Sequence, residues 1–268
     1  MDGVRLVVFD WAGTTIDFGS LAPLDAFITV FAARGVTVTS DEAREPMGRH
    51  KKEHLRIMLQ MPSVAEKWRQ RHGGRAWTEA DLEEMYRELV PRQMESIERH
   101  SRVIDGVVSC VAELRRRGIR VAGATGYFPE ATARVARLAA EQGYVTDANI
   151  GADEVAAGRP APWMIFRLME RLNVYPPTAV LKIGDTRVDI EEGLNARVWS
   201  VGVTSSSSEV GLTTEQFANL EAEARRRILD QATTRLRNAG AHEVIETIAE
   251  VPALVDRINQ RIKRGERP

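Results

Sequence analysis

The sequence predicts an α/β protein built on a doubly wound parallel sheet, with a helical domain inserted after the first strand. Short apolar runs rich in β-branched residues recur along the chain, and from residue 104 onward stretches with helical spacing separate them. Between the first two runs, residues 23–100 show helical spacing and no convincing strand. Strands joined by helices form right-handed βαβ units, so we expect parallel strands covered by helices on both faces.

The first strand is expected in the apolar run VRLVVFD at residues 4–10. After residue 104 the pattern predicts helices at 107–117, 129–142 and 161–172, and strands at 118–124, near 149–150, at 179–183 and at 198–203. The tail from Thr213 onward adds a charged helical stretch, an edge strand at 243–247 and a final helix near 253–262.

The inserted domain is assigned to residues 18–101, which leaves residues 1–17 and 102–268 for the core. Within it, the sequence RHGGR at 71–75 predicts a loop, and Thr78 followed by two acidic residues predicts a helix start.

Composition points to a small-molecule partner. The 37 basic and 38 acidic residues nearly cancel, so no strong field favours nucleic acid or an anionic membrane. Cys110 is the only cysteine, which excludes an intrachain disulfide framework, and its apolar surroundings predict a buried thiol in a reducing cytoplasm. We find no apolar run of about 18 residues, so neither a membrane-spanning nor a secreted protein is expected.

Polar side chains follow three of the expected strands. Asp10, Thr125 and Asp185 each stand at a carboxyl end, and Asp189 lies one helical turn beyond Asp185. The carboxyl ends of parallel strands meet at one edge of a sheet, so these groups are expected to converge there. Asp10 and Asp185 offer the oxygen ligands that Mg²⁺ prefers, although Asp10 alone would equally suit a turn cap.

Two neighbouring segments add groups that bind anions. The stretch AGTT after Trp11 can turn tightly and direct backbone N–H groups at an anion. Arg159, in the turn AGRP just before a helix, supplies a fixed positive charge that can pair with a nucleophile and a transferring group. The Thr125 hydroxyl can donate a hydrogen bond to a phosphoryl oxygen.

The motifs DWAGT, ATGY, AGRP and GDTRVD, in this order, resemble those of the haloacid dehalogenase superfamily over essentially the whole chain. This resemblance implies a Rossmann-like core, an inserted α-helical cap domain and an aspartyl nucleophile at Asp10. It also implies Mg²⁺ held by Asp10, Asp185 and the backbone carbonyl of Ala12, with Asp189 supporting the bound waters.

Ala12 departs from the pattern of most superfamily phosphatases. Those enzymes place an aspartate there to protonate a departing alkoxide. The chain therefore either serves a leaving group that needs no such proton or is catalytically silent.

Lys51 and His54 are three residues apart, which places them on one face of a helix. An amine beside an imidazole suits Schiff-base chemistry, but the amine must be neutral. A free lysine has a pKa of about 10.4, so its surroundings would have to lower that pKa by ~3 units, about 4 kcal/mol. From the residues alone, a solvated helix face shared with Lys52 and Glu53 remains the alternative.

The segments FDWAGTTID, EAREPMG, TGY, AGRPAPWM and VGVTSSSSEVGLT resemble the phosphonoacetaldehyde hydrolase, or phosphonatase, family. The resemblance implies hydrolysis of the phosphorus–carbon bond of phosphonoacetaldehyde to acetaldehyde and phosphate, in 2-aminoethylphosphonate degradation. The implied route runs through a Schiff base at Lys51 and an aspartyl phosphate at Asp10, and a homodimer is implied as well, with apolar cap residues at 21–31 as its candidate interface.

The same resemblance assigns the remaining residues of the site. It implies that His54 carries protons and that five residues contact the substrate, namely Ala12, Met47, Gly48, Gly126 and Tyr127. Arg49 and His50 depart from the apolar residues expected at their positions. Trp11, Trp163 and Trp199 are expected to pack in the core or at the cap interface.

Two other functions fit the same fold. One is a phosphomonoester phosphatase or phosphomutase, against which Ala12 argues. The other is a catalytically silent protein that binds phosphometabolites, in which the Lys51 amine would be unreactive.

Overall fold

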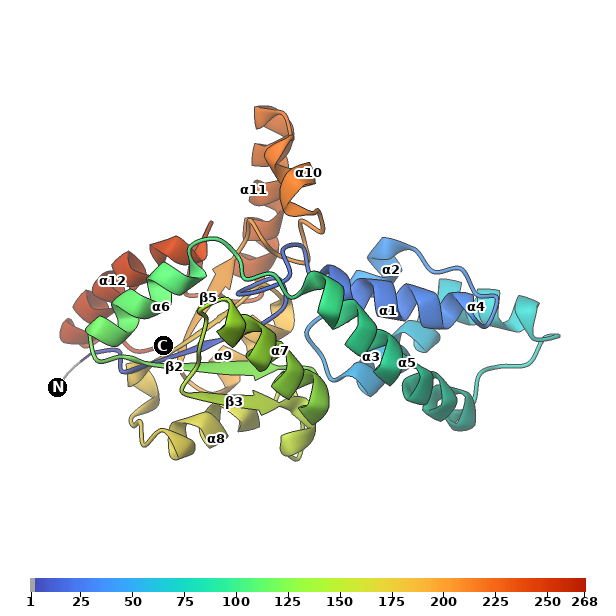
Figure 1. The fold of residues 1–268 in the computed structure, drawn as a ribbon, viewed down its shortest axis with the longest axis horizontal. Helices are drawn as coiled ribbons and strands as arrows, with labels where there is room; N and C mark the ends of the chain where they lie inside the picture. The colour runs from blue at the N-terminus through green and yellow to red at the C-terminus, as the bar shows by residue number, and fades with distance from the viewer. Residues whose placement is uncertain (1–2) are drawn as a thin grey trace.

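A computed structural model describes residues 3–268 and confirms the predicted fold class. Six strands form one parallel sheet in the order β3-β2-β1-β4-β5-β6, with helices on both faces (Figure 1). The strands are β1 Leu6–Phe9, β2 Arg120–Thr125, β3 Ala148–Gly151, β4 Val180–Gly184, β5 Trp199–Val203 and β6 Glu243–Ile245. The order reverses between β1 and β4, which is where ligands bind in doubly wound sheets.

The core helices follow the expected alternation with strands. They are α6 Val107–Arg116, α7 Pro129–Glu141, α8 Trp163–Arg171, α9 Arg187–Asn195, α10 Thr214–Ala218, α11 Ala222–Asn238 and α12 Val251–Lys263. Three short 3₁₀ turns lie at Ala152–Glu154, Pro177–Ala179 and Ile248–Glu250.

The continuous apolar run of β1 is explained by burial on both faces. Val7 and Phe9 pack into one cluster with α6, α7 and α12, whereas Leu6 and Val8 pack into a second cluster with α8. All four side chains are fully buried. A strand buried on both faces favours apolar residues at every position, and the first polar residue after β1 is Asp10, just beyond its end.

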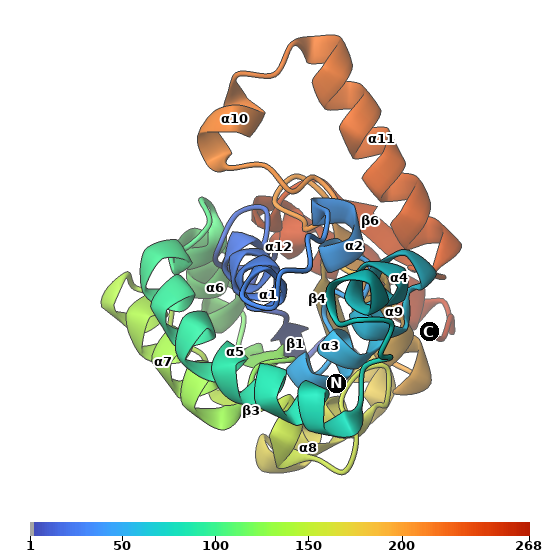
Figure 2. The same cartoon turned by 90° about the vertical axis from the view of Figure 1, so that its right-hand side faces the viewer.

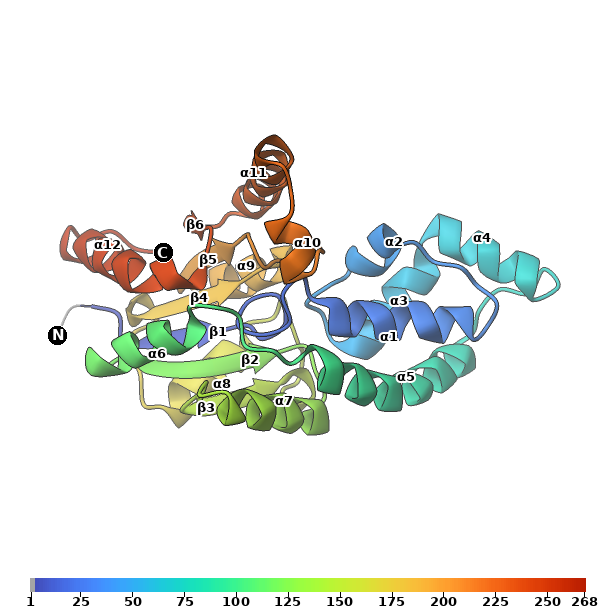
Figure 3. The same cartoon turned by 45° about the horizontal axis from the view of Figure 1, so that its top comes forward.

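Five helices between β1 and β2 form the cap. They are α1 Leu21–Ala32, α2 Ser40–Arg44, α3 Lys51–Gln60, α4 Pro62–Arg71 and α5 Glu79–His100. They enclose a hydrophobic cluster of their own, centred on residues such as Phe27, Leu55 and Trp68. The cap stands beyond the carboxyl ends of the strands (Figures 1 and 3), and Figure 2 shows it end-on with the hairpin of α10 and α11 projecting above the core.

The two connections between core and cap are paired with each other. The Asp17 N–H donates to the Arg102 carbonyl at 3.0 Å, and the Ile104 N–H donates to the Thr15 carbonyl at 2.9 Å. The chain therefore leaves and re-enters the core at one narrow place, beside the end of β1.

Two apolar regions bear on expectations from the sequence, one around Trp163 and one at residues 21–31. The expectation that Trp163 is packed is wrong, because its side chain is 49% exposed on the first turn of α8 beside Phe166. Most apolar residues of 21–31 lie inside the cap cluster, and the homodimer expected through them stays a prediction. No helix among residues 3–268 is both long and apolar enough to span a membrane.

The cap of α5 gives a stability prediction. The Thr78 hydroxyl accepts a hydrogen bond from the Asp81 N–H, and the Asp81 carboxylate accepts one from the Thr78 N–H. We expect Thr78→Ala to lower the free energy of unfolding by about 1 kcal/mol in urea denaturation. The Asp81 N–H loses its acceptor, and the hydrogen bond from the Thr78 N–H loses its reciprocal partner. Thr78→Ser keeps the hydroxyl and should stay close to wild type; equal losses in both variants would contradict this account.

Candidate active site

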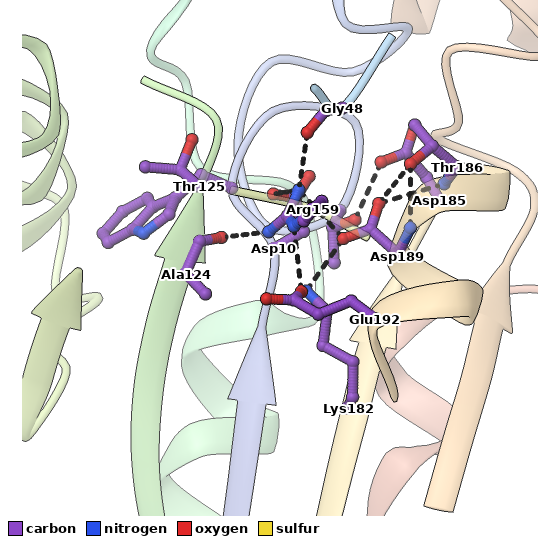
Figure 4. A network of polar contacts seen from close by, with 12 residues as sticks. Asp10, Gly48, Ala124, Thr125, Arg159, Lys182, Asp185, Thr186, Asp189 and Glu192 are labelled. Carbon is purple, nitrogen blue, oxygen red and sulfur yellow. Dashed lines mark hydrogen bonds and ion pairs between the residues drawn. The ribbon is translucent and has the colours of Figure 1, made fainter. Parts of the chain in front are cut away.

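The register of the sheet brings the predicted residues together. Phe9 lies level with Gly123 on β2 and Ile183 on β4, and the Asp10 N–H extends the ladder to the Ile183 carbonyl at 2.8 Å. Thr125 and Asp185 therefore stand one residue beyond Asp10 on either side. The predicted convergence at the sheet edge is observed (Figure 4).

The loop after β1 wraps around Asp185. Gly13 has φ +80°, and a Cβ there would lie 2.6 Å from the Asp185 Oδ2, so only glycine allows this approach. The Thr14 hydroxyl donates to the Asp185 Oδ1 at 3.1 Å, and the Ser208 N–H donates to Oδ2 at 2.8 Å. Both carboxylate oxygens are thus held in a fixed direction.

The serine run at 205–208 is part of this scaffold. All four serines are buried. The Ser206 hydroxyl donates to the Gly13 carbonyl at 2.8 Å, while the Ser206 carbonyl accepts from the Gly19 N–H at 2.8 Å. The run ties the loop after β5 to the loop after β1 and to the first connection to the cap.

Arg159 lies at the centre of the site, with its guanidinium fully buried. Its Nη1 is 2.8 Å from the Asp10 Oδ1 and 2.9 Å from the Asp189 Oδ1. Its Nη2 donates to the Ala124 carbonyl at 2.5 Å, and its Nε donates to Glu192 at 2.9 Å. Burial lowers the pKa of this group, but the surrounding carboxylates outweigh that and raise it, so the guanidinium stays charged.

Lys182 and Glu192 were not anticipated from the sequence. The Lys182 Nζ, fully buried on β4, is 2.8 Å from Asp189 and 3.4 Å from Glu192. One signal pointed to this pair: a lone ionisable residue inside the apolar run at 179–183 needs a buried partner of opposite charge. Glu192 also stands one helical turn after Asp189, on the same side of α9.

The buried charges fit a divalent cation. Four carboxylates, those of Asp10, Asp185, Asp189 and Glu192, face two cations in this network, Arg159 and Lys182. Burial raises the pKa of Asp185 well above its usual range, as do the charges of its acidic neighbours. Burial also raises the pKa of Asp10, although Arg159 opposes the shift.

Three of these carboxylates offer an oxygen within 4.8 Å of one another, namely those of Asp10, Asp185 and Asp189. Such a cluster of hard ligands with two uncompensated charges suits a bound metal ion.

The cap reaches the core through the loop before α3. Gly48 has φ +86°, and a Cβ there would lie 2.5 Å from the Thr186 Oγ1. A Cβ on Gly126 would lie 2.9 Å from the Gly48 carbonyl oxygen. The two glycines therefore permit close contact between cap and core. The Thr125 hydroxyl accepts from the Tyr127 N–H at 3.3 Å, which leaves its own proton for a ligand.

Lys51 begins α3 and is 3% exposed. Its Nζ lies 4.8 Å from the centre of the Tyr127 ring and 5.6 Å from that of Phe27. Burial lowers the pKa of the amine from 10.5 to about 8, against the opposing charge of Asp10. The alternative of a solvated face does not hold for Lys51, whereas Lys52 next to it is partly exposed and pairs with Glu83.

His54, three residues after Lys51 on α3, is not among the residues that line the cavity. Its ring stacks on Phe27 with centroids 3.6 Å apart, and its Nε2 is 2.9 Å from the Ala43 carbonyl oxygen, which requires the proton on Nε2. The Nδ1 has no hydrogen-bond partner among residues 3–268. Burial and the charge of Lys51 lower its pKa well below the ordinary value, so the ring is neutral with an acceptor nitrogen.

The cavity between cap and core is small. Its volume is about 20 Å³, on a scale where one water needs roughly 10–15 Å³. Its lining holds nearly all of the predicted residues: Asp10, Ala12, Met47, Gly48, Lys51, Thr125, Gly126, Tyr127 and Arg159. A cavity of this volume is too small for an organic substrate, so binding one requires the cap and core to move apart.

His50, one of the departures noted in the sequence, also joins cap to core. Its Nε2 lies 2.5 Å from the Asp153 Oδ1 in the turn after β3. His50, which precedes Lys51 in the chain, thus makes an additional contact between cap and core.

The lowered pKa of Lys51 predicts an early-titrating amine. We expect reductive methylation of Lys51 by formaldehyde and cyanoborohydride, followed by peptide mass spectrometry, to accelerate with pH and level off with a midpoint near 8. Only the neutral amine reacts, and with this pKa it makes up roughly a tenth of the population at pH 7. Lys51→Arg is the control, because its peptide carries no amine at this position. A midpoint close to 10.5 would refute the lowered pKa of Lys51.

The raised pKa values of Asp10 and Asp185 predict that metal binding releases protons. Below these pKa values the metal-free carboxyls hold protons that a bound cation must displace, so the release is largest in acid and fades as pH rises. Calorimetry with Mg²⁺ near pH 5.5, in buffers of different ionisation enthalpy, should show buffer-dependent heats.

Asp185→Asn should abolish binding in the same titration. Asp256→Asn, which removes a surface partner of Arg117, should bind as wild type does. Heats that do not depend on the buffer, or unchanged binding by Asp185→Asn, would argue against a metal at this position.

The chain is similar to known hydrolases over most of its length. A model of the haloacid dehalogenase-like hydrolases matches residues 4–197. A phosphonoacetaldehyde hydrolase-like protein of Syntrophobacter fumaroxidans is 43% identical over 265 residues, which cover 99% of this chain and 95% of the relative. A phosphonoacetaldehyde hydrolase of Hahella chejuensis is 42% identical over 265 residues, covering 99% of this chain and 90% of the relative.

Solved structures show the same relationship. A phosphonoacetaldehyde hydrolase-like protein from Oleispira antarctica superposes with a TM-score of 0.97 at 40% identity, covering 99% of this chain and 96% of the other. A hydrolase from Pseudomonas syringae, at 17% identity and a TM-score of 0.68, covers 95% of this chain and 99% of its own and shares the fold. The chain belongs to the haloacid dehalogenase-like hydrolases and, within them, to the phosphonoacetaldehyde hydrolase family.

Proposed function

We propose that this hydrolase cleaves the phosphorus–carbon bond of phosphonoacetaldehyde and releases acetaldehyde and phosphate. The observation that carries the proposal is the buried amine of Lys51, with its pKa lowered to about 8, on the same cavity as the Asp10 carboxylate. Relatives at 42% identity bear the name of this activity. An amine and a carboxylate on opposite sides of one cavity match a substrate with an aldehyde at one end and a phosphonate at the other.

The first step is formation of an imine. The neutral Lys51 amine attacks the aldehyde carbon, and one water leaves. We assign the Nδ1 of His54 as acceptor for the proton that the Lys51 ammonium sheds, because this nitrogen is neutral, unpartnered within residues 3–268 and one helical turn away. His54 then returns this proton to the hydroxyl of the carbinolamine, which leaves as water, while the imine nitrogen keeps one proton of the amine. The protonated imine then withdraws electrons from the neighbouring carbon.

The second step is transfer of the phosphoryl group. A carboxylate oxygen of Asp10 forms a bond to phosphorus while the phosphorus–carbon bond breaks, and its electron pair moves toward the protonated imine to give an enamine. Arg159 stabilises the charge on the transferring group, and Thr125 donates its free proton to a phosphoryl oxygen.

The third step restores the enzyme. The enamine takes up a proton on carbon and is hydrolysed by one water, which frees Lys51 and acetaldehyde. A second water hydrolyses the aspartyl phosphate at Asp10 and releases phosphate. Because one water left when the imine formed, the sum consumes one water for each substrate.

The metal ligands proposed are Asp10, Asp185 and the Ala12 carbonyl, with Asp189 in support. Bound there, Mg²⁺ would neutralise the carboxylates and the phosphonate oxygens, so that an anionic nucleophile can approach an anionic substrate. The methyl side chain of Ala12 has no proton to give, which suits a leaving carbon whose electrons enter the imine.

The proposal extends to the whole protein. Residues 18–101 act as the cap and residues 1–17 and 102–268 as the core. Met47, Gly48, Gly126 and Tyr127 contact the substrate, which is a small phosphonate formed during 2-aminoethylphosphonate degradation. We place the enzyme in the cytoplasm as a homodimer.

The direct test is product analysis. With Mg²⁺ and phosphonoacetaldehyde, wild type should release acetaldehyde and phosphate in equal amounts, and Lys51→Arg should lose at least ~10³-fold in turnover, because a guanidinium forms no imine. Lys52→Arg, which changes the neighbouring partly exposed amine, should retain turnover.

A second measurement checks the covalent step. Borohydride added with acetaldehyde should attach a two-carbon unit to Lys51 in wild type. Cleavage of an ordinary phosphate ester without activity on the phosphonate would favour a phosphatase or phosphomutase. Absence of turnover and of any adduct would favour a silent phosphometabolite-binding protein.

A further inference from the structure

Four buried charged side chains form a closed ring beneath Asp10, and we call them the charge ring: Arg159, Asp189, Lys182 and Glu192. The Asp189 Oδ1 lies 2.9 Å from the Arg159 Nη1 and 2.8 Å from the Lys182 Nζ. The Glu192 Oε2 lies 2.9 Å from the Arg159 Nε and 3.4 Å from the Lys182 Nζ. Positive and negative groups alternate around the ring, and all four side chains are fully buried (Figure 4).

Two members of the ring lie behind the reacting groups. Lys182 comes from β4 and Glu192 from α9, and neither lines the cavity. The mechanism described above uses neither of them. A buried lysine and a buried glutamate are costly to desolvate, and an apolar pair of similar volume would do the same packing.

Glu192 fixes the direction of the Arg159 guanidinium. The group is planar, so anchoring two of its nitrogens determines where the third one points. Glu192 holds Nε and the Ala124 carbonyl holds Nη2, which leaves Nη1 directed at Asp10 at 2.8 Å. Both anchors belong to the core, so the direction is set there.

Lys182 makes this arrangement electrostatically possible. Burial raises the pKa of Glu192, and the charges of Lys182 and Arg159 oppose that shift. Lys182 also pairs with Asp189, which would otherwise share its charge with Arg159 alone. Removing one charged member leaves a buried charge without compensation, and the guanidinium is then drawn toward the remaining carboxylates.

We propose that Glu192 and Lys182 are positioning residues that keep the Arg159 guanidinium aimed at Asp10 and at the phosphoryl group during its transfer. The inference rests on the proposed function, in which charge moves from Asp10 onto the phosphoryl oxygens. Misplacing a catalytic group by about 1 Å can cost ~10²-fold in rate. Ground-state binding of substrate, which involves several other groups, is affected far less.

Steady-state kinetics on purified, Mg²⁺-loaded enzyme test the proposal. Glu192→Gln keeps the shape and removes the charge, and we expect kcat to fall about 30-fold with KM within about threefold of wild type. Glu191→Gln is the matched control, because within residues 3–268 this neighbouring residue on α9 pairs only with the exposed Arg187. It should match wild type in kcat, KM and unfolding temperature.

The double variant Lys182→Met/Glu192→Gln separates positioning from plain stabilisation. It removes both charges, so the unfolding temperature should return close to wild type, while kcat should stay at least about tenfold reduced because Arg159 has lost its charged anchor. Recovery of kcat together with the unfolding temperature would overturn the proposal. Glu192→Asp, which keeps the charge but shortens the side chain, should fold and still lose kcat, which keeps the test decisive if Glu192→Gln does not fold.

Inhibitor binding makes the test independent of the substrate. Vanadate mimics the five-coordinate transferring group and inorganic phosphate mimics the ground state. In Glu192→Gln, vanadate affinity should fall about tenfold or more and phosphate affinity by less than about threefold. Equal losses for both would overturn the inference. If wild type does not hydrolyse phosphonoacetaldehyde, the proposed function fails, while the comparison of vanadate with phosphate still decides the role of Glu192.

Discussion

The pairing of β1 with both β2 and β4 is the constraint on which the site depends. Three parallel strands in fixed register bring Asp10, Thr125 and Asp185 to one edge of the sheet. Because the strands are buried on both faces, the acidic groups at their ends sit over an apolar interior rather than in water. The excess of negative charge, the need for Arg159 and Lys182, and the suitability of the carboxylate cluster for a cation all follow from that placement.

The cap adds a different electrostatic environment to the same cavity. Lys51 lies between aromatic rings and loses most of its hydration, so its amine titrates near 8. Asp10, on the core side, lies among other carboxylates, and its negative charge is balanced by a buried cationic partner. Two opposite kinds of surroundings, one apolar and one highly charged, meet in one cavity because the cap supplies Lys51 and the core supplies Asp10.

The fold could be predicted from the sequence because the alternation of β-branched runs and helical spacing is a local property of the chain. The same pattern also predicted the convergence of Asp10, Thr125 and Asp185, since parallel strands end on one side. The identity of the partners of Lys182 could not be predicted from the sequence pattern, because Glu192 belongs to another element and its contact depends on how α9 crosses β4. Trp163 was misjudged because side-chain type alone does not reveal which face of α8 meets the solvent.

The small volume of the cavity has a consequence for substrate selectivity. With the cap in contact with the core there is room for about one water, so the amine and the carboxylate meet only around a molecule that fits both. A phosphate ester without an aldehyde would engage the core alone, and a simple aldehyde would engage the cap alone. In the proposed reaction, selectivity therefore depends on the contact between cap and core: each recognises half of the substrate, and the phosphorus–carbon bond breaks only when both halves are bound.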